Sequence, residues 1–243
     1  MITSYAYTDI GGREINEDSH FFRQSDTHNV YVVCDGLGGH DKGEEASALV
    51  TDVFAGRFEE VTDENAESFI GDSLMIGQNM LISEQIARNA REDMKTTATA
   101  VMIRGGKIYR GYVGDSRIYV FNRNKVVEHT KDHSVPQMLV TAREIKEKDI
   151  RHHPDRNRLL RVMGIDWEEP RYQLEPVISV DDCQAILMCT DGFWELIDEK
   201  QMCRLLKKSS TVKEWINLMA EVVKKNGAGT NMDNNTALGI WMR

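Results

Sequence analysis

The chain has 243 residues, of which 41% are apolar and 28% are charged, as in soluble globular proteins with a hydrophobic core. Its formal net charge is −9, and such a field repels polyanions, which makes nucleic acid an unfavourable partner. Its apolar runs are far shorter than the ~20 residues that cross a bilayer, so we expect a cytoplasmic protein without a membrane partner.

The first third of the chain alternates between strand and helix patterns. We expect a strand at about residues 19–23, a polar turn, and an apolar strand at 30–34. A helix is predicted from about 43 to 60, because apolar side chains recur there at helical spacing. A second helix is predicted over 64–90, although two glycines weaken its pattern.

The central third changes to the period of β-strands. Strands are predicted at 97–104, 107–113 and 116–122, with Gly105 and Gly106 forming a two-residue hairpin turn between the first two. The following segment, residues 134–162, is polar and charged, and its pattern is either irregular or helical.

Strands return in the last third, at about residues 172–178 and 185–189. Two helices follow, and each opens with a capping-box pattern, the first at Asp198 and the second at Thr211. The chain closes with a predicted strand at 236–242.

The order of these elements predicts the fold class. Turn-linked groups of strands separated by helices favour antiparallel sheets covered by helices over a doubly wound parallel sheet. No internal repeat and no linker rich in Pro, Gly or Ser interrupts the pattern, so we expect a single domain over residues 1–243.

Aspartates stand at the ends of the predicted core strands. The apolar run 30–34 leads directly into Asp35, and the run 185–189 leads into Asp191 after one threonine. Asp233 precedes the last strand, and Asp115 lies in a Gly-Asp-Ser turn between two strands. One such aspartate is more often a turn or helix-cap residue than a ligand, but the recurrence at strand ends favours a shared site.

One more aspartate joins this set if the first two predicted strands pair. Asp18 and Asp35 are then directly opposite in an antiparallel ladder, with Cβ atoms about 4.5–5.5 Å apart. Like charges so close are destabilising unless some are protonated or a cation lies between them. Carboxylate oxygens without histidine or thiolate ligands fit Mg²⁺ or Mn²⁺ better than zinc.

Other phosphate-handling motifs are excluded by residue type. The glycines that follow Asp35 lack the third glycine of a dinucleotide fingerprint, and no GxxxxGK[ST] motif occurs. None of the four cysteines has an arginine six positions later, as a cysteine-dependent phosphatase requires.

The chain resembles the type-2C, metal-dependent protein phosphatases, in the form typical of the bacterial branch. The resemblance covers nearly the whole chain, and its blocks appear in family order: REINED (13–18), VCDGLGGH (33–40), GEEAS (43–47), TT (96–97), VGDSR (113–117), TKDHS (130–134), CTDG (189–192) and DNNT (233–236). Each block alone is a weak signal, whereas all of them together are a strong one.

This resemblance implies an α+β fold, a four-layer αββα sandwich in which helices flank two antiparallel β-sheets. It also implies a dinuclear Mn²⁺ or Mg²⁺ centre at one end. Asp35 would bridge both ions, the Gly36 carbonyl would bind one of them, and Asp191 and Asp233 would bind the other. Asp115 would help Asp191 to hold a third, weaker ion.

The implied activity is that of a protein-serine/threonine phosphatase. Arg13 would grip the substrate phosphate, because its guanidinium fork donates two parallel hydrogen bonds. Glu17 and Asp18 would orient water, and metal-activated water would attack the phosphorus without a covalent enzyme intermediate. The expected partners are phosphorylated proteins and a serine/threonine kinase that acts in opposition, and a monomer is expected.

Two positions depart from the family pattern. Leu37 stands where some members have a histidine that serves as general acid, and His40 is expected to face solvent instead. Lys95 replaces a common glycine before the Thr-Thr pair. The resemblance also implies a flap-like segment at about residues 134–162, where the family is variable. Its basic part, 143–161, includes Arg156 and Arg158, and it either helps to choose acidic substrates or forms a solvated surface.

Three alternatives to the phosphatase interpretation stay open. The chain could be a silent binding module of the same fold, although no metal-site aspartate is missing. It could hydrolyse small phosphate esters rather than phosphoproteins. A structural calcium-binding protein is the least favoured, because no EF-hand-like loop is present.

Overall fold

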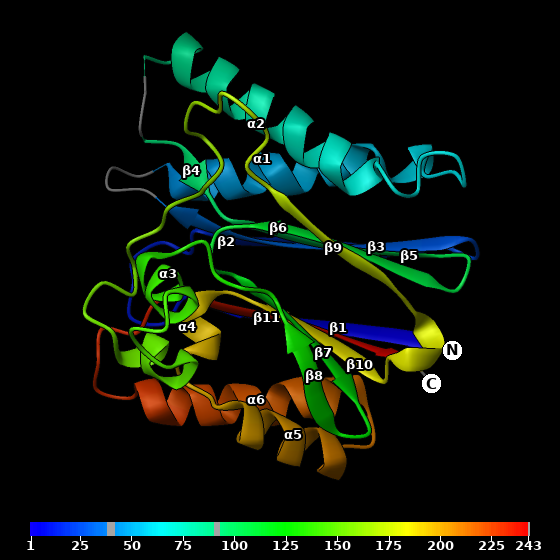
Figure 1. Ribbon diagram of the computed structural model, residues 1–243, viewed down its shortest axis with the longest axis vertical. Coiled ribbons are helices and arrows are strands. Elements are labelled where there is room, and N and C mark those ends of the chain that lie inside the picture. Colours follow the sequence, from blue (N-terminus) through cyan, green and yellow to red (C-terminus); the bar gives the residue numbers. More distant parts are fainter. Residues whose placement is uncertain (38–41, 90–92, 243) are drawn as a thin grey trace.

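Two antiparallel β-sheets lie face to face in the computed structural model, which describes residues 1–37, 42–89 and 93–242 (Figure 1). The first sheet has the strand order β1 (Ile2–Asp9), β11 (Asn235–Met242), β10 (Ala185–Cys189), β7 (Arg117–Asn122) and β8 (Lys125–His129). The second sheet has the order β2 (Asp18–Gln24), β3 (His28–Leu37), β5 (Ala98–Arg104), β6 (Lys107–Val113) and β9 (Gln173–Ser179), and β4 (Lys95–Thr96) pairs with β3.

Helices cover the outer faces of both sheets (Figure 1). The second sheet is covered by α1 (Gly43–Gly56) and α2 (Phe69–Ala87), with the short η1 (Phe58–Glu60) between them. The first sheet is covered by α5 (Glu199–Lys208) and α6 (Val212–Gly227). Shorter helices lie near one end of the sandwich or in the connections: α3 (Val135–Thr141), η2 (Glu147–His152), η3 (Val180–Asp182) and α4 (Asp191–Trp194). The expected four-layer αββα arrangement is confirmed.

The apolar runs of the sequence become strands that are buried on both faces. Along β3, Val30, Val32 and Cys34 belong to the core beneath α1 and α2, while Tyr31 and Val33 belong to the core between the sheets. Successive side chains of a strand point to opposite faces, so a central strand between two layers needs apolar residues at every position. The same alternation occurs in β10, and it explains why both strands were predictable.

The hairpin and cap predictions are confirmed with one difference. Gly105 and Gly106 both have positive φ, 57° and 73°, as a tight β5–β6 turn requires. The capping box at Asp198 is reciprocal. At Thr211 only half of the box forms, because the hydroxyl accepts a hydrogen bond from the Glu214 backbone while the Glu214 carboxylate accepts one from Ser210.

Several boundaries differ from the prediction. The second helix begins at Phe69 rather than near residue 64, because Thr62 and Asn65 exchange side-chain to backbone hydrogen bonds in a turn. Strands β1, β4 and β8 were not predicted. Both β1 and β8 lie at sheet edges and keep mostly half-buried or exposed side chains, so they lack an apolar run.

No helix in the described part of the chain combines the length and the apolar character needed to cross a membrane.

Candidate active site

Asp18 and Asp35 occupy directly opposed positions in the β2–β3 ladder, as the sequence predicted. The register is set by the short turn between the two strands, where the Ser25 N–H donates to the His28 carbonyl at 2.9 Å. Both residues come from the second sheet. Asp18 begins β2 and Asp35 lies near the end of β3, so the two carboxylates meet at one end of the sandwich.

The first sheet contributes the next two aspartates at the same end. Asp191 follows β10 and begins α4, and Asp233 lies just before β11, the neighbour of β10. Asp115 lies in the connection from β6 to β7, where the chain crosses from the second sheet to the first. The Asp191 and Asp35 carboxyls interact there.

Burial and the charges of neighbouring carboxylates raise the pKa values of Asp35, Asp115 and Asp191. Burial raises the pKa of Asp35 well above its usual range, and repulsion from Asp191, Asp18, Asp115 and Asp233 adds to this. Burial, followed by the charge of Asp191, also raises the pKa of Asp115 well above its usual range. For Asp191, burial and Asp233 raise the pKa, while the interaction with Asp35 acts in the opposite direction. The cluster therefore holds protons, or another cation, more tightly than isolated carboxylates would.

Asp18 carries a carboxylate oxygen without a partner. Its Oδ2 accepts a hydrogen bond from the Thr190 hydroxyl at 3.0 Å, whereas Oδ1 is buried and has no hydrogen-bond partner among the described residues. Burial raises the pKa of Asp18 to about 7 against the effect of the Thr236 and Thr190 hydroxyls. A buried acceptor of this kind is normally satisfied by water or an ion.

The donor set fits a hard divalent cation, but the side chains are not arranged around one. Within residues 1–37, 42–89 and 93–242, no group of three or more His, Cys, Asp or Glu side chains stands in an arrangement that could hold a metal ion. The carboxylates are engaged with one another, with threonine hydroxyls and with Arg13. Their oxygen chemistry, the repulsion among them and the unpartnered Asp18 oxygen nevertheless match what Mg²⁺ or Mn²⁺ requires. Binding would need side-chain rotations at this cluster.

Gly36 and Glu17 bring a backbone element to the same place. The Gly36 N–H donates to the Glu17 carbonyl at 3.1 Å, and a Cβ on Gly36 would overlap the Gly43 carbonyl and lie 2.6 Å from the Glu17 carbonyl oxygen. Only glycine permits this approach. Burial, followed by the charge of Glu44, raises the pKa of the Glu17 carboxyl.

Arg13 reaches the cluster through an ion pair. Its Nη2 donates to Asp233 Oδ2 at 2.8 Å, and both side chains are partly exposed. The residue predicted to bind phosphate and a residue predicted to bind metal thus neutralise each other in this structure. All eight predicted site residues, Arg13, Glu17, Asp18, Asp35, Gly36, Asp115, Asp191 and Asp233, lie at this end of the sandwich.

Asn234 positions this site, and its role was not predicted. Its Nδ2 donates to the carbonyls of Ile10 and Ile15 at 2.8 and 3.0 Å, and its Oδ1 accepts from the Glu17 N–H at 2.9 Å. These three bonds fix the loop that carries Arg13 and Glu17. The Asp-Asn-Asn-Thr sequence signals a polar turn, but no pattern indicates the distant loop that it holds.

A second support lies beneath Asp115. The indole Nε1 of Trp194 donates to the Asp115 carbonyl at 3.0 Å, and the Arg117 guanidinium lies 3.4 Å from the centre of the same indole. Arg117 also forms two hydrogen bonds of 2.7 Å with the buried Asp132 carboxylate. The TKDHS block therefore has a structural role at its aspartate, which holds the turn through Arg117.

A polar cavity of about 480 Å³ opens beside the carboxylates. Its described lining includes Arg13, Asp191, Asp233 and residues of the 143–161 segment, among them Arg151 and Arg156. Arg156 pairs with Glu195 at 3.0 Å, and burial, followed by the charge of Asp191, raises the pKa of Glu195 to about 7. The segment thus does border the site.

Four further positions that the sequence singled out are Arg158, Leu37, Lys95 and His40. Arg158 is not among the described lining residues of this cavity, and its carbonyl accepts a hydrogen bond from the Val135 N–H at 2.9 Å. Leu37 ends β3 and Lys95 begins β4 opposite it. His40 lies outside the residues that the structure describes.

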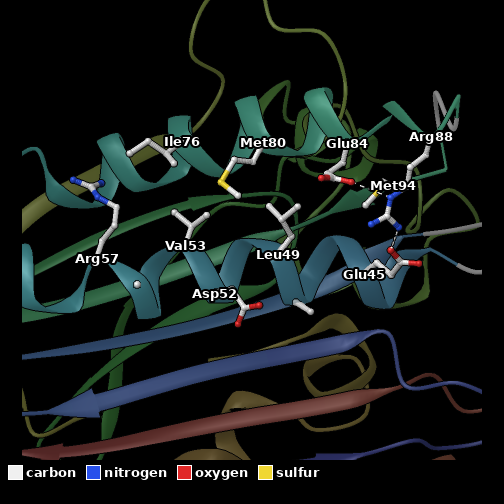
Figure 2. Close-up of a pocket in the computed structure, with 12 residues that line it drawn as sticks. Glu45, Leu49, Asp52, Val53, Arg57, Ile76, Met80, Glu84, Arg88 and Met94 are labelled. Carbon is white, nitrogen blue, oxygen red and sulfur yellow. Dashed lines mark hydrogen bonds and ion pairs between the residues drawn. The ribbon is translucent and has the colours of Figure 1, made fainter. Parts of the chain in front are cut away.

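The larger groove between α1 and α2 is not this site. It has a volume of about 560 Å³, and Leu49, Val53, Ile76 and Met80 face one another across it (Figure 2). Its described lining contains none of the predicted site residues.

Comparisons with known proteins agree with the geometry. The family model described as protein phosphatase 2C matches residues 8–236. The serine/threonine phosphatase stp of Listeria welshimeri is 27% identical over 232 residues, which cover 93% of this chain and 90% of that protein. The crystal structure of the serine/threonine phosphatase Stp1 from Staphylococcus aureus, 28% identical, superposes with a TM-score of 0.90 over 100% of this chain and 96% of that one.

A third comparison concerns the fold alone. The catalytic domain of the serine/threonine protein phosphatase PstP, solved in complex with two manganese ions, is 22% identical. It superposes with a TM-score of 0.80 and covers 99% of this chain and 97% of that one.

Proposed function

The chain belongs to the protein phosphatase 2C family, and on that premise we propose that it hydrolyses phosphoserine and phosphothreonine in proteins. The observation that carries this proposal is the convergence of Asp18 and Asp35 from one sheet with Asp191 and Asp233 from the other. Carboxylates this close repel one another and lower the stability of the folded protein. A cluster of this kind is typical of a site that binds cations.

Two divalent cations, Mn²⁺ or Mg²⁺, are the proposed cofactors. Asp35, the Gly36 carbonyl, Asp191 and Asp233 would hold them, and Asp115 with Asp191 would serve a third and weaker ion. When bound, such ions activate water as a nucleophile and offset charge on the phosphoryl oxygens.

The protein groups have separate proposed roles. Arg13 binds the substrate phosphate through its guanidinium once Asp233 is neutralised, because phosphate then becomes its better partner. Asp18 Oδ1, which has no partner within the described chain, accepts a hydrogen bond from the attacking water and orients it. Glu17 contributes a second carboxylate for the same water network.

The 143–161 segment supports a finer proposal about substrates. Arg151 and Arg156 line the cavity beside Asp191 and Asp233, where they pair with Glu199 and Glu195. Once cations neutralise those aspartates, the cavity favours acidic residues near the phosphorylated one. Replacing Arg156 with Ala is expected to raise KM for acidic phosphopeptides while leaving KM for neutral ones unchanged. An equal KM change for both would contradict this role.

We infer a cytoplasmic, monomeric, single-domain enzyme whose substrates are phosphorylated by a serine/threonine kinase. The relatives named as serine/threonine phosphatases support phosphoproteins as the substrate class.

The test is release of phosphate from a phosphothreonine peptide with Mn²⁺ or Mg²⁺, with EDTA, and with Asp191→Asn. Asp181→Asn is the matched control, because Asp181 is an exposed aspartate in η3. Phosphate release should require the metal, and of the two variants only Asp181→Asn should retain it. No turnover from folded, metal-loaded protein would indicate a silent binding module, and faster hydrolysis of small phosphate esters than of phosphopeptides would indicate a metabolite phosphatase.

A further inference from the structure

A second cavity, of about 500 Å³, lies at the base of the 134–162 segment. It is bordered by the residues where that segment leaves the sheets, Lys131 to Ser134, and by those where it returns, Leu160 and Arg161. The two ends are joined by the bond from the Leu160 N–H to the His133 carbonyl, 2.7 Å, and by that from the Val135 N–H to the Arg158 carbonyl, 2.9 Å. The described lining of this flap-base cavity includes none of the carboxylates of the active site.

The cavity carries positive charge without a matching anion. Lys131 and Arg161 line it, and neither takes part in an ion pair with any carboxylate of the described residues. The carboxylate in its lining, Asp132, is fully engaged, since both of its oxygens accept from Arg117 at 2.7 Å. A ligand that enters this cavity therefore meets two cations and no available carboxylate within its described lining.

Buried polar groups in the lining lack partners. Gln137 is 6% exposed, and its buried Oε1 has no hydrogen-bond partner in the described part of the protein. Leaving such an acceptor unsatisfied is destabilising, so a native structure usually supplies a donor. The His133 Nε2 also forms no hydrogen bond of normal geometry, although the Gln173 side chain lies near it.

His133 is fixed as a neutral donor. Its Nδ1 accepts a hydrogen bond from the Gly114 N–H at 3.1 Å, which places the ring proton on Nε2. Burial, followed by the charge of Arg161, lowers the pKa of His133 to about 4, so the ring is uncharged at neutral pH. The ring stacks on Tyr112 with 4.7 Å between centroids and 8° between planes, which makes this wall rigid.

Apolar side chains complete the lining. Met138 is 52% exposed and Leu160 is 44% exposed, and both border the cavity. A mostly apolar wall of this volume with a few polar groups is the usual composition of a small-molecule site.

We propose that the flap-base cavity binds a small organic anion. The anionic group, a carboxylate or a phosphate, lies between Lys131 and Arg161, and the apolar body packs on Met138 and Leu160. A hydroxyl or amine of the ligand donates to the Gln137 amide oxygen.

Such a ligand would tie together the two ends of the flap segment. It would also contact His133, whose backbone N–H donates to the Gly114 carbonyl at 2.9 Å, next to Asp115. Occupancy is thus linked by hydrogen bonds to the turn that presents Asp115 to the active site.

The test is a ¹H–¹⁵N NMR titration of the full-length protein in EDTA, which removes metal from the active site. The probes are 4-hydroxyphenylacetate, phenylacetate, which lacks the hydroxyl, and 4-hydroxybenzylphosphonate, which carries the phosphate-like group. We expect saturable shifts at residues 131–142 and 160–161, with 4-hydroxyphenylacetate bound more tightly than phenylacetate. The comparison of the carboxylate with the phosphonate decides which anion the site prefers.

Variants make the assignment specific. Replacing Lys131 and Arg161 together by Ala should weaken binding of all three probes by about tenfold or more. The double substitution of Lys207 and Lys208 by Ala, at exposed positions of α5, removes the same charge and should leave binding unchanged. Gln137→Met should reduce binding of 4-hydroxyphenylacetate to the level of phenylacetate.

Two outcomes would overturn the proposal. One is the absence of saturable shifts at the cavity for every probe in the millimolar range. The other is binding that the Lys131 and Arg161 substitutions leave intact, or that the α5 control weakens equally. Neither outcome bears on phosphatase activity, because the titration uses neither metal nor phosphopeptide.

Discussion

Arg13 donates from Nη2 to Asp233 Oδ2 across 2.8 Å, so the proposed phosphate ligand is held by a proposed metal ligand. The two residues are 220 positions apart in the sequence, and the Asn234 bonds to the Arg13 loop bring them together. Phosphate and Asp233 compete for one guanidinium. Metal binding at Asp233 should therefore free Arg13 and couple phosphate affinity to metal occupancy.

The first prediction concerns Arg13 itself. Arg13→Ala should raise KM for a phosphothreonine peptide by about 10- to 100-fold with a smaller change in kcat, because a charge-assisted bidentate contact to phosphate is lost. Arg13→Lys should recover part of this loss, since lysine keeps the charge but not the fork. Arg204→Ala, at an exposed position of α5, is the control for removing one positive charge. An unchanged KM in Arg13→Ala would remove this residue from the phosphate site.

The second prediction concerns the pH dependence of stability without metal. The Asp18 pKa is raised from 3.8 to about 7 on folding, so the folded state binds a proton that the unfolded state releases between these values. Its contribution to stability is complete below the unfolded pKa and is lost as pH rises toward 7. In EDTA, the free energy of unfolding should therefore fall between pH 4 and 7.

Asp18→Asn should flatten this fall, because the amide cannot ionise, and at pH 8 it should be more stable than the natural protein by at least about 1 kcal/mol. Urea unfolding followed by circular dichroism measures the free energy of unfolding at each pH. Asp181→Asn should follow the natural curve. A slope that Asp18→Asn leaves unchanged would show that Asp18 does not keep a raised pKa.

The third prediction tests the close approach at Gly36. Gly36→Ala should destabilise the protein by about 2–4 kcal/mol, because the added Cβ overlaps the Gly43 and Glu17 carbonyls and these backbones must move. Gly56→Ala is the matched control, since a Cβ there meets nothing within 4 Å. At that position in α1, alanine should stabilise by about 0.5–1 kcal/mol. Equal effects of the two substitutions in thermal unfolding would contradict the packing described for Gly36.

The fourth prediction separates a buried ion pair from an exposed one. Asp132→Asn should cost about 3–5 kcal/mol, because it leaves the buried Arg117 charge without a counter-ion. Asp63→Asn removes the partner of Arg104 at the surface and should cost less than about 1 kcal/mol. Because Arg117 stacks on the indole that binds the Asp115 carbonyl, Asp132→Asn should also weaken metal binding, which calorimetry can measure.

The parts of the fold that sequence predicted are those fixed by local pattern. The apolar run of β3 and the short polar turn before it indicated an antiparallel hairpin, and that hairpin places Asp18 opposite Asp35. Edge strands such as β1 escaped prediction, because half-buried positions accept polar residues and leave no apolar run. The onset of α2 was placed too early, since side-chain bonds of Thr62 and Asn65 compete with helix formation.

The charged residues of the site could be predicted from the sequence, but the residues that position them could not. Aspartates recur at the ends of the predicted strands, and that recurrence can be detected in the sequence alone. Asn234 and Trp194 act through hydrogen bonds to carbonyls far away in the chain, and such bonds leave no spacing to detect. The pairing of Arg13 with Asp233 also depends on the completed fold.

The pairing of β1 with β11 has a mechanical consequence. Ile2 lies opposite Met242 and Asp9 lies opposite Asn235, so both ends of the chain emerge at the edge of the sandwich away from α3 and α4 (Figure 1). A force that pulls residues 2 and 242 apart acts across the ladder and breaks its hydrogen bonds one pair after another, which needs little force. The loss of strand pairing proceeds toward Asp233, and a cation bound there would be the first interaction to resist it strongly. Under tension, the loaded protein should therefore open from its termini and halt at the active site.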